Sequence, residues 1–340
     1  MNATFVPSLL GEDARRRVIS VVVPFLNERD TLKTLVARVS DVLRTQGEAF
    51  EIILVDDGST DGSGVEAADL ERRCPPVCLI TLKRNFGKAA ALSAGLSAAR
   101  GDVIVTMDAD LQDLPEELPG FLAEIDAGFD VVSGWKRKRH DPLSKTLPSK
   151  VFNFVLSRAF SLRLHDFNCG FKAYTREAAN YLQRRLYGDL HRFTPALLHS
   201  AGFRITELPV KHEPRRFGHS KFGSGRLMRG LLDLLTVVLL TRYRSRPLHF
   251  FGGIGLGFGA LGVLGLVYLT ALWFLGLGPI GDRPLLLFSI LSTLAGLQLI
   301  GVGLIGELVV VSKGHQDAPY VLDERRAVAH REEENNATAC

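Results

Sequence analysis

From about residue 17 to residue 210, the chain alternates between short hydrophobic runs and longer segments of helical character. The run VISVVVPF is rich in β-branched residues, which is typical of a strand buried on both faces of a sheet. Residues 29–47 carry apolar side chains at helical spacing, residues 87–101 are rich in alanine, and both segments end at a glycine. This alternation predicts an α/β fold with a doubly wound, mostly parallel sheet. The predicted strands are residues 18–25, 50–57, 77–84 and 102–110.

Two later stretches show no alternation at all. No charged residue lies between Phe250 and Gly281 or between Leu285 and Gly306. Each stretch exceeds the ~20 apolar residues that a helix needs to cross a bilayer, and the many glycines allow close helix packing. Buried helices of a soluble core are the alternative, but soluble helices of this length usually show a polar face. We therefore expect two membrane-spanning helices.

The charge distribution predicts the orientation of these spans. The formal net charge is only +4, which is weak evidence about partners, and we expect no nucleic-acid partner. Arginines precede the first span, whereas the loop between the spans holds only Asp282 and Arg283. The positive-inside rule then places both ends of the chain in the cytoplasm, at the cytoplasmic membrane.

The opening residues lack the pattern of a signal peptide, and we expect the four cysteines to be reduced thiols.

The segment RLMRGLLDLLTVVLL (226–240) is apolar but interrupted by Arg229 and Asp233. We interpret it as an amphipathic helix at the membrane interface, with a core helix of the soluble domain as the alternative. The predicted domains are an N-terminal extension (1–16), a cytosolic α/β domain (17–222), an interfacial helix and linker (223–246), a transmembrane hairpin (247–312) and a cytoplasmic tail (313–340).

Polar residues follow each of the four predicted strands. In doubly wound sheets, ligands bind beyond the carboxyl ends of the strands, so these residues should gather at one edge. Agreement between four separate segments is a stronger signal than any one motif. The residues are Asn27 and Glu28, Asp56 and Asp57, Arg84 and Asn85, and Asp108 and Asp110.

Asp108 and Asp110 are two positions apart at the end of a hydrophobic run. Residues i and i+2 of a strand point the same way, so both carboxylates can face one site. Hard oxygen ligands of this kind suit Mg²⁺ or Mn²⁺ with a substrate diphosphate, while the simpler alternative is a solubilised strand end. Asp113, in DLPEE, has the spacing of a helix N-cap. Asp57 can accept hydrogen bonds from a nucleobase or a ribose, although turn formation alone would also explain it.

Four motifs together resemble a known family. In order and spacing, VVVPFLNE, LVDDGSTD, RNFGKAAALSAGLSAARGD and MDADLQDLPEE are similar to the family-2 glycosyltransferases. With two C-terminal spans, the chain resembles the polyprenyl-phosphate glycosyltransferases, a group that includes dolichyl-phosphate mannose synthases and bacterial undecaprenyl-phosphate glucosyltransferases. The resemblance covers about residues 17–312. Phe25 stands where the family often has Tyr, so a hydroxyl contact is lost there.

The resemblance implies a GT-A fold and assigns roles to residues at the sheet edge. Asp108 and Asp110 would hold the metal and the donor diphosphate. The implied donor-binding residues are Pro24, Asn27, Glu28, Asp57 and Gln112.

Two further segments match the family. RLHDFNCGFKAYTRE resembles the segment near the donor sugar, which makes Asp166 a candidate for orienting the acceptor or acting as a base. A loop-capping role is the alternative. EPRRFGHSKFG resembles the R-x-x-G-x-S-K element that approaches the phosphates of donor and acceptor, and binding of anionic headgroups is its alternative. The residues implied for the acceptor phosphate are Arg215, Arg216, Ser220 and Lys221.

Two charged features have open interpretations. The basic run Lys136–Arg139 has three possible roles. It forms a solvated loop, it neutralises the donor phosphates, or it binds the surface of an acidic bilayer. Glu307 lies inside the second apolar stretch, and an intramembrane acid is a functional candidate by default. Because it lies near the cytoplasmic end, we expect it at the interface.

Together these features predict an inverting, metal-dependent glycosyltransferase. The expected donor is a nucleotide-sugar, with UDP-glucose as the first choice, and the expected acceptor is a membrane polyprenyl phosphate, undecaprenyl or dolichyl. The alternatives are a GDP-mannose-dependent mannosyltransferase, a transferase to another lipid or to a polysaccharide, and a membrane-tethered nucleotide-sugar sensor without activity. The glycine-rich spans need packing partners, so we expect a homo-oligomer, with a tetramer as the candidate form.

Overall fold

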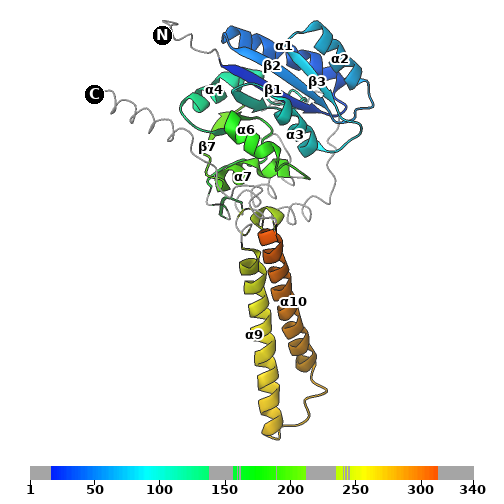
Figure 1. Ribbon diagram of the computed structural model, residues 1–340, viewed down its shortest axis with the longest axis vertical. Helices are drawn as coiled ribbons and strands as arrows, with labels where there is room; N and C mark the ends of the chain where they lie inside the picture. The colour runs from blue at the N-terminus through cyan, green and yellow to red at the C-terminus, as the bar shows by residue number, and fades with distance from the viewer. Residues whose placement is uncertain are drawn as a thin grey trace, which may run out of the picture. The chain divides into compact units, whose positions relative to one another are not determined.

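The computed structural model describes residues 17–137, 156–158, 160, 162–188, 190–211, 235–239, 241, 243 and 246–312. The chain divides into two compact units, Met1–Arg229 and Gly230–Cys340. The first holds all the strands of the described residues and the second holds two long helices (Figure 1).

The first unit is built on one mixed sheet of seven strands in the order β3-β2-β1-β4-β6-β5-β7. Strands β1, β2, β3 and β4 run parallel, and β6 is antiparallel to both of its neighbours, β4 and β5. β7 is parallel to β5. The predicted doubly wound, mostly parallel sheet is therefore confirmed, with one antiparallel strand in it. The strands are Val18–Phe25 (β1), Ala49–Asp56 (β2), Val77–Thr81 (β3), Val103–Thr106 (β4), Val131–Lys136 (β5), Lys172–Thr175 (β6) and Ile205–Val210 (β7).

Helices cover both faces of this sheet (Figure 1). On one face, α1, α2 and α4 pack on a core that includes Val21 and Leu54. On the other face, α3 lies directly on the sheet, because a Cβ at Gly95 would overlap the side chain of Val22. α6 packs beside α3 and against β6. The bounds are Arg29–Thr45 (α1), Ser63–Arg73 (α2), Lys88–Ala98 (α3), Leu118–Asp126 (α4), Arg176–Gln183 (α6) and Thr194–Ser200 (α7), with short 3₁₀ segments Pro115–Glu117 (η1) and Leu190–Phe193 (η2).

The parallel register brings the carboxyl ends of the first four strands to one edge of the sheet. Phe25, the last residue of β1, pairs with Asp56, the last residue of β2, which in turn pairs with Thr81 at the end of β3. β4 lies on the other side of β1 and ends at Thr106, opposite Val22. The loops that follow these strands therefore meet, as the alternation of the sequence predicted.

The second unit contains α9 (Pro247–Phe274) and α10 (Pro284–Ser312). Both helices are long and apolar enough to cross a membrane, with mean hydropathies of 2.0 and 2.1 over their most apolar parts. They pack closely through glycines: a Cβ at Gly296 would lie 2.5 Å from the carbonyl oxygen of Gly255, and one at Gly262 would lie 2.6 Å from that of Ser289. Small residues thus bring the two backbones together.

Glu307 lies near the end of α10, beside the start of α9. Its Oε2 accepts a hydrogen bond of 3.3 Å from the backbone N–H of Leu248. The first N–H groups of a helix have no partner within the helix, and an anion at this end also interacts favourably with the helix dipole. Glu307 therefore caps the neighbouring helix. Of the expected interfacial helix, residues 235–239 are helical, and most of the rest lies outside the described residues.

Candidate active site

The loop that leaves β4 holds the two carboxylates singled out by the sequence. Asp108, Asp110 and Gln112 are partly exposed, whereas Ala109 and Leu111 between them are buried. The alternation predicted for a strand is thus present, but β4 already ends at Thr106, so irregular backbone produces it. Leu111 has a φ of +60°, a left-handed conformation that is costly for a non-glycine residue, and strained residues of this kind cluster at functional sites.

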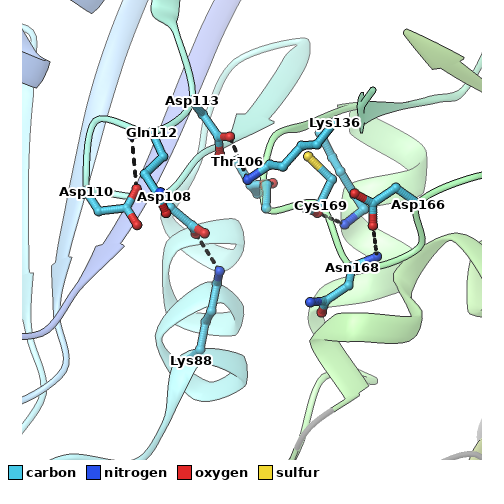
Figure 2. Close-up of polar contacts among 12 residues, drawn as sticks. Lys88, Thr106, Asp108, Asp110, Gln112, Asp113, Lys136, Asp166, Asn168 and Cys169 are labelled. Atoms are coloured by element: carbon cyan, nitrogen blue, oxygen red, sulfur yellow. Dashed lines mark hydrogen bonds and ion pairs between the residues drawn. The ribbon is translucent and has the colours of Figure 1, made fainter. Parts of the chain in front are cut away.

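Asp108 faces the start of α3 across this edge. The ammonium of Lys88, the first residue of that helix, forms an ion pair with Asp108 Oδ1 (Figure 2). Burial opposes ionisation of the carboxyl, but the positive charges of Lys88 and Lys136 outweigh it and hold the pKa of Asp108 below its usual value. Lys88 was not singled out by the sequence analysis, although it directly follows the loop after the third strand and so belongs to the same edge.

Asp110 has the opposite electrostatic character. Its Oδ1 accepts a hydrogen bond of 3.2 Å from the backbone N–H of Gln112 (Figure 2). Burial, and then the negative charge of Asp108, raise the pKa of Asp110 above its ordinary value. Two carboxylates that interact in this way are stabilised as a pair of anions by a cation between them.

The donor set fits a divalent cation. Mg²⁺ is typically held by one or two carboxylates together with waters and substrate phosphates, and it does not need a complete cage of protein ligands. Asp108 and Asp110 supply two such carboxylates. Within the described part of the chain there is no group of three or more His, Cys, Asp or Glu side chains that could bind a metal on their own, so phosphate oxygens would have to complete the coordination.

Asp113 does not cap a helix, so that prediction is wrong. The 3₁₀ segment begins after Leu114, and Asp113 is instead fully buried with its Oδ1 2.9 Å from the Nζ of Lys136 (Figure 2). Despite burial, this partner raises the pKa of Lys136 above its ordinary value. Interpreting the basic run as a wholly solvated loop is therefore wrong for Lys136, which ends β5 with a side chain only 15% exposed. Lys138 and Arg139 lie outside the described residues.

The loops after β1 and β2 are locked together by side chain–backbone hydrogen bonds. Asn27 has a φ of +56°, and its Oδ1 accepts a bond of 2.8 Å from the N–H of Thr60. The N–H of Asn27 donates to Ser59 Oγ at 3.0 Å, and that of Glu28 donates to Ser63 Oγ at 2.9 Å. Asn27 thus shapes the loop, and Pro24 lies within β1, paired with Val55.

Asp57 connects β2 with the start of α3. Its carboxylate is buried and accepts hydrogen bonds from the N–H of Phe86, at 2.7 Å, and from the N–H of Gly87, at 3.0 Å. The guanidinium of Arg84 lies 4.2 Å from the centre of the Phe86 ring. Asp57 therefore holds the loop that leads to Lys88. A nucleobase that binds Asp57 would have to share the carboxylate with the two backbone N–H groups that already donate to it.

Asp166 lies on the far side of the site, in the loop before β6. It is buried, and its Oδ1 accepts a bond of 3.1 Å from the N–H of Asn168, which is the loop-capping geometry weighed for it (Figure 2). Glu207 of β7 anchors this loop by accepting from the N–H groups of His165 and Asp166, at 2.7 and 2.9 Å. Nothing in the sequence pattern indicated Glu207, which is 41 residues away from Asp166.

The loop before β6 approaches Asp108 closely at Gly170. A Cβ at this position would lie 2.6 Å from Asp108 Oδ2, so only glycine leaves room for the carboxylate. Next to this contact is a cavity of about 20 Å³. It is lined by Lys88, Asp108, Asn168, Lys172, His191 and Thr194 among others. The residues expected to bind the acceptor phosphate, Arg215, Arg216, Ser220 and Lys221, lie outside the described residues.

Comparison with known proteins identifies the class of enzyme. The model of the family "Glycosyl transferase family 2" matches residues 20–182, which span β1 to α6 and include the Asp108–Asp110 loop. The fold is similar to that of the mannosyl-3-phosphoglycerate synthase from Rubrobacter xylanophilus, with a TM-score of 0.51 and 17% identity over 68% of this chain and 77% of that one. The GT-A type of sheet is thereby confirmed.

Similarity to characterised relatives extends into the second unit. The chain is 39% identical to the dodecaprenyl-phosphate galacturonate synthase of Rhizobium johnstonii, over 88% of this chain and 90% of that protein. It is 37% identical to the undecaprenyl-phosphate 4-deoxy-4-formamido-L-arabinose transferase of Pseudomonas fluorescens, over 85% and 84% of the two chains. The chain therefore belongs to glycosyltransferase family 2, and it is an enzyme of that family.

Proposed function

We propose that this enzyme transfers a sugar from a nucleoside-diphosphate donor to the phosphate of a membrane polyprenyl lipid. The observation that carries the proposal is the pair Asp108 and Asp110 at the carboxyl edge of the sheet, beside Lys88. The acceptor is supported by the two relatives, both of which are named for polyprenyl phosphates, and by two helices long enough to cross a membrane in the same chain.

The proposed reaction is an inverting displacement. An oxygen of the lipid phosphate forms a bond to the anomeric carbon while the bond from that carbon to the donor diphosphate breaks. A phosphate monoester has a second pKa near ~6, so it is largely dianionic at neutral pH and needs no strong general base. The enzyme then acts mainly by positioning two anionic substrates and by neutralising their charge.

Each site residue has a proposed role in this positioning and charge neutralisation. A divalent cation, Mg²⁺ or Mn²⁺, would supply charge stabilisation of the leaving diphosphate when it is bound. Asp108 and Asp110 would hold that cation, and Gln112 would contact the donor beside it. The donor nucleoside would lie over the loops that Asn27 and Asp57 organise, near Pro24 and Glu28.

Asp166 is better supported as a positioning residue than as a base. It is buried and bonded within its own loop, so its carboxylate orients the segment that faces the acceptor.

We further propose that the acceptor phosphate binds the loop with Arg215, Arg216, Ser220 and Lys221. The catalytic domain is proposed to face the cytoplasm, and the enzyme is proposed to be a homo-oligomer. We also propose the domain boundaries that were predicted from the sequence.

The transferred sugar is proposed to be a modified one. Glucose was the first choice from the sequence, but the two polyprenyl-phosphate relatives carry galacturonate and formamido-arabinose in their names. Galacturonate has a carboxylate that glucose lacks, and formamido-arabinose has a substituted nitrogen that glucose lacks. A donor with such a group is therefore proposed before UDP-glucose.

A donor panel tests the proposal. Membranes containing the full chain are incubated with undecaprenyl phosphate and radiolabelled UDP-galacturonate, UDP-4-deoxy-4-formamido-arabinose, UDP-glucose or GDP-mannose, with and without Mg²⁺ or Mn²⁺. We expect label in the organic phase with a modified-sugar donor, and only with the cation. Label in no lipid extract for any donor would contradict the proposal, and retention of donor without turnover would favour a sensor.

A further inference from the structure

A polar cavity of about 20 Å³ lies between α3, α6, the sheet and the η2–α7 segment, and it is lined by Asp108. That space accepts about one water molecule or a small polar group rather than a whole sugar ring. Leucines of α3 and of the α6 region line part of it. Three polar side chains that the proposed reaction has not used also line it: Lys172, His191 and Thr194.

Lys172 is a buried ammonium without a counter-ion among the described residues. Lys172 lies on β6, an interior strand of the sheet, opposite Thr106, and the residue is only 3% exposed. Nζ donates to the carbonyl oxygen of Cys169, and no carboxylate in the described part of the chain forms an ion pair with it. An uncompensated buried charge costs several kcal/mol, so such lysines are rare unless a ligand pairs with them.

The charges around Lys172 do not compensate it. Burial lowers the pKa of Lys172, and repulsion from Lys88 lowers it further. The attraction of Asp166 and Asp108 raises the pKa but offsets this decrease only in part. Asp108 is already paired with Lys88, and burial raises the pKa of the neighbouring Cys169 thiol to about 12, so that thiol is neutral. The cavity therefore contains a buried amine whose charge the nearby carboxylates offset only in part.

Two further groups in the cavity lack hydrogen-bond partners. The Nδ1 atom of His191 is buried with no partner among the described residues, and the same holds for the Oγ1 atom of Thr194. The Thr194 hydroxyl lies close enough to Tyr174 to lower the pKa of the tyrosine, but the two hydroxyl groups do not have the geometry of a hydrogen bond. Burial lowers the pKa of His191 to about 3, so its imidazole is neutral and can donate one N–H. Buried polar atoms in native proteins are nearly always bonded, so a polar group bound in the cavity would satisfy both atoms.

We propose that Lys172, His191 and Thr194 form a subsite for an anionic oxygen group of a substrate, next to the reacting centre. One ammonium, one hydroxyl and one imidazole N–H match the two oxygens of a carboxylate or two oxygens of a phosphate. The group is the carboxylate of a uronic-acid donor sugar or the phosphate of the lipid acceptor. This inference rests on the proposed transferase function, and its tests include readouts that need no turnover.

Stability is the first readout. Lys172→Met replaces the ammonium with an apolar side chain of similar length, and Thr194→Val replaces the hydroxyl with a methyl group. If the two polar groups serve a ligand, the thermal midpoint of the purified full chain stays equal or rises in both variants. Lys33→Met on the exposed face of α1 is the matched control and leaves both stability and activity unchanged. A fall of more than about 3 °C in both variants, but not in the control, would show a structural role and overturn the inference.

Anion binding is the second readout. The thermal midpoint of the wild-type chain is measured with free galacturonate, with inorganic phosphate and with chloride at the same ionic strength. We expect galacturonate or phosphate to raise the midpoint by about 2–4 °C over chloride, and Lys172→Met to abolish that rise. Equal midpoints with all three anions would overturn the inference even if the transferase reaction itself is demonstrated.

Kinetics then distinguish the two sources of the anion. With the donor found in the panel, Lys172→Met should lower kcat/KM on the order of 30-fold or more, because one partner of a buried charge pair is removed. A rise in KM for the uronate donor identifies the sugar carboxylate, and a rise in KM for lipid phosphate identifies the acceptor phosphate. Unchanged KM values for both substrates would contradict the subsite.

Discussion

Lys88 and Asp108 form an ion pair that joins the first residue of α3 to the loop leaving β4. The lysine thereby occupies one oxygen of a carboxylate that the proposed metal requires. In the proposed reaction, Lys88 would neutralise Asp108 before the donor binds, and its ammonium would pair with a phosphate oxygen of the donor once Asp108 holds a cation. Lys88 thus belongs to the charge balance of the site together with the two proposed metal ligands.

Replacing Lys88 should change the acid side of the pH profile. The pKa of Asp108 is held below its usual value mainly by Lys88, against the effect of burial, so Lys88→Met raises it. Activity requires the ionised carboxylate, is present above that pKa and is lost as the pH falls through it. We therefore expect the acid limb of kcat/KM to move to higher pH in Lys88→Met, measured between about pH 4.5 and 8. Acid limbs that superimpose for wild type and variant would refute this role.

A methyl group at Gly170 should disturb the site without unfolding the domain. The added Cβ would lie 2.6 Å from Asp108 Oδ2, so the carboxylate would have to move away from its position. Displacements of this size at a reacting centre cost about 100-fold in rate. Gly170→Ala should therefore lower kcat/KM by about that factor with little change in thermal midpoint. Gly281→Ala, which meets nothing within 4 Å, is the control and should match the wild type.

The buried pair Asp113–Lys136 should behave as a coupled unit in stability. Their charged atoms are 2.9 Å apart, and the side chains are 0% and 15% exposed. Asp113→Leu or Lys136→Met alone removes one partner of a buried ion pair, which destabilises by roughly 3–5 kcal/mol. The double variant should cost clearly less than the sum of the two, as measured by denaturation of the full chain. Additive costs would mean that the pair contributes no coupling energy.

The contact between α9 and α10 can be tested with two glycines on the same helix. A Cβ at Gly296 would lie 2.5 Å from the carbonyl oxygen of Gly255, whereas a Cβ at Gly301 meets nothing within 4 Å. Gly296→Val should therefore separate the two helices and lower the thermal midpoint of the detergent-solubilised chain. Gly301→Val should leave it unchanged. Equal effects of the two substitutions would argue against this packing.

Much of the fold follows from the sequence because its elements have clear local patterns. The strand Val18–Phe25 is a continuous β-branched run, and α1 has apolar side chains at helical spacing up to a glycine. Since parallel strands place their carboxyl ends together, the position of Asp108 and Asp110 at the sheet edge could also be predicted. Both inferences needed only local pattern and one topological rule.

The contacts that depend on register could not be predicted in this way. Lys136 looked like the start of a solvated basic run, but its strand lies beside the antiparallel β6, and its side chain reaches Asp113. Glu207 holds the Asp166 loop only because β7 pairs with β5. The burial of Lys172 likewise follows from its place in the centre of the sheet. Local sequence does not encode which strands become neighbours.

The cation dependence of sugar transfer in Asp110→Asn tests the proposed metal site most directly. The substitution keeps the shape of the side chain and removes one metal-binding charge, and Asp41→Asn on the exposed face of α1 is the matched control. With the active donor and lipid phosphate, wild type and Asp41→Asn should label the lipid in a cation-dependent manner, and Asp110→Asn should lose at least about 100-fold. Full cation-dependent labelling by Asp110→Asn would contradict the account.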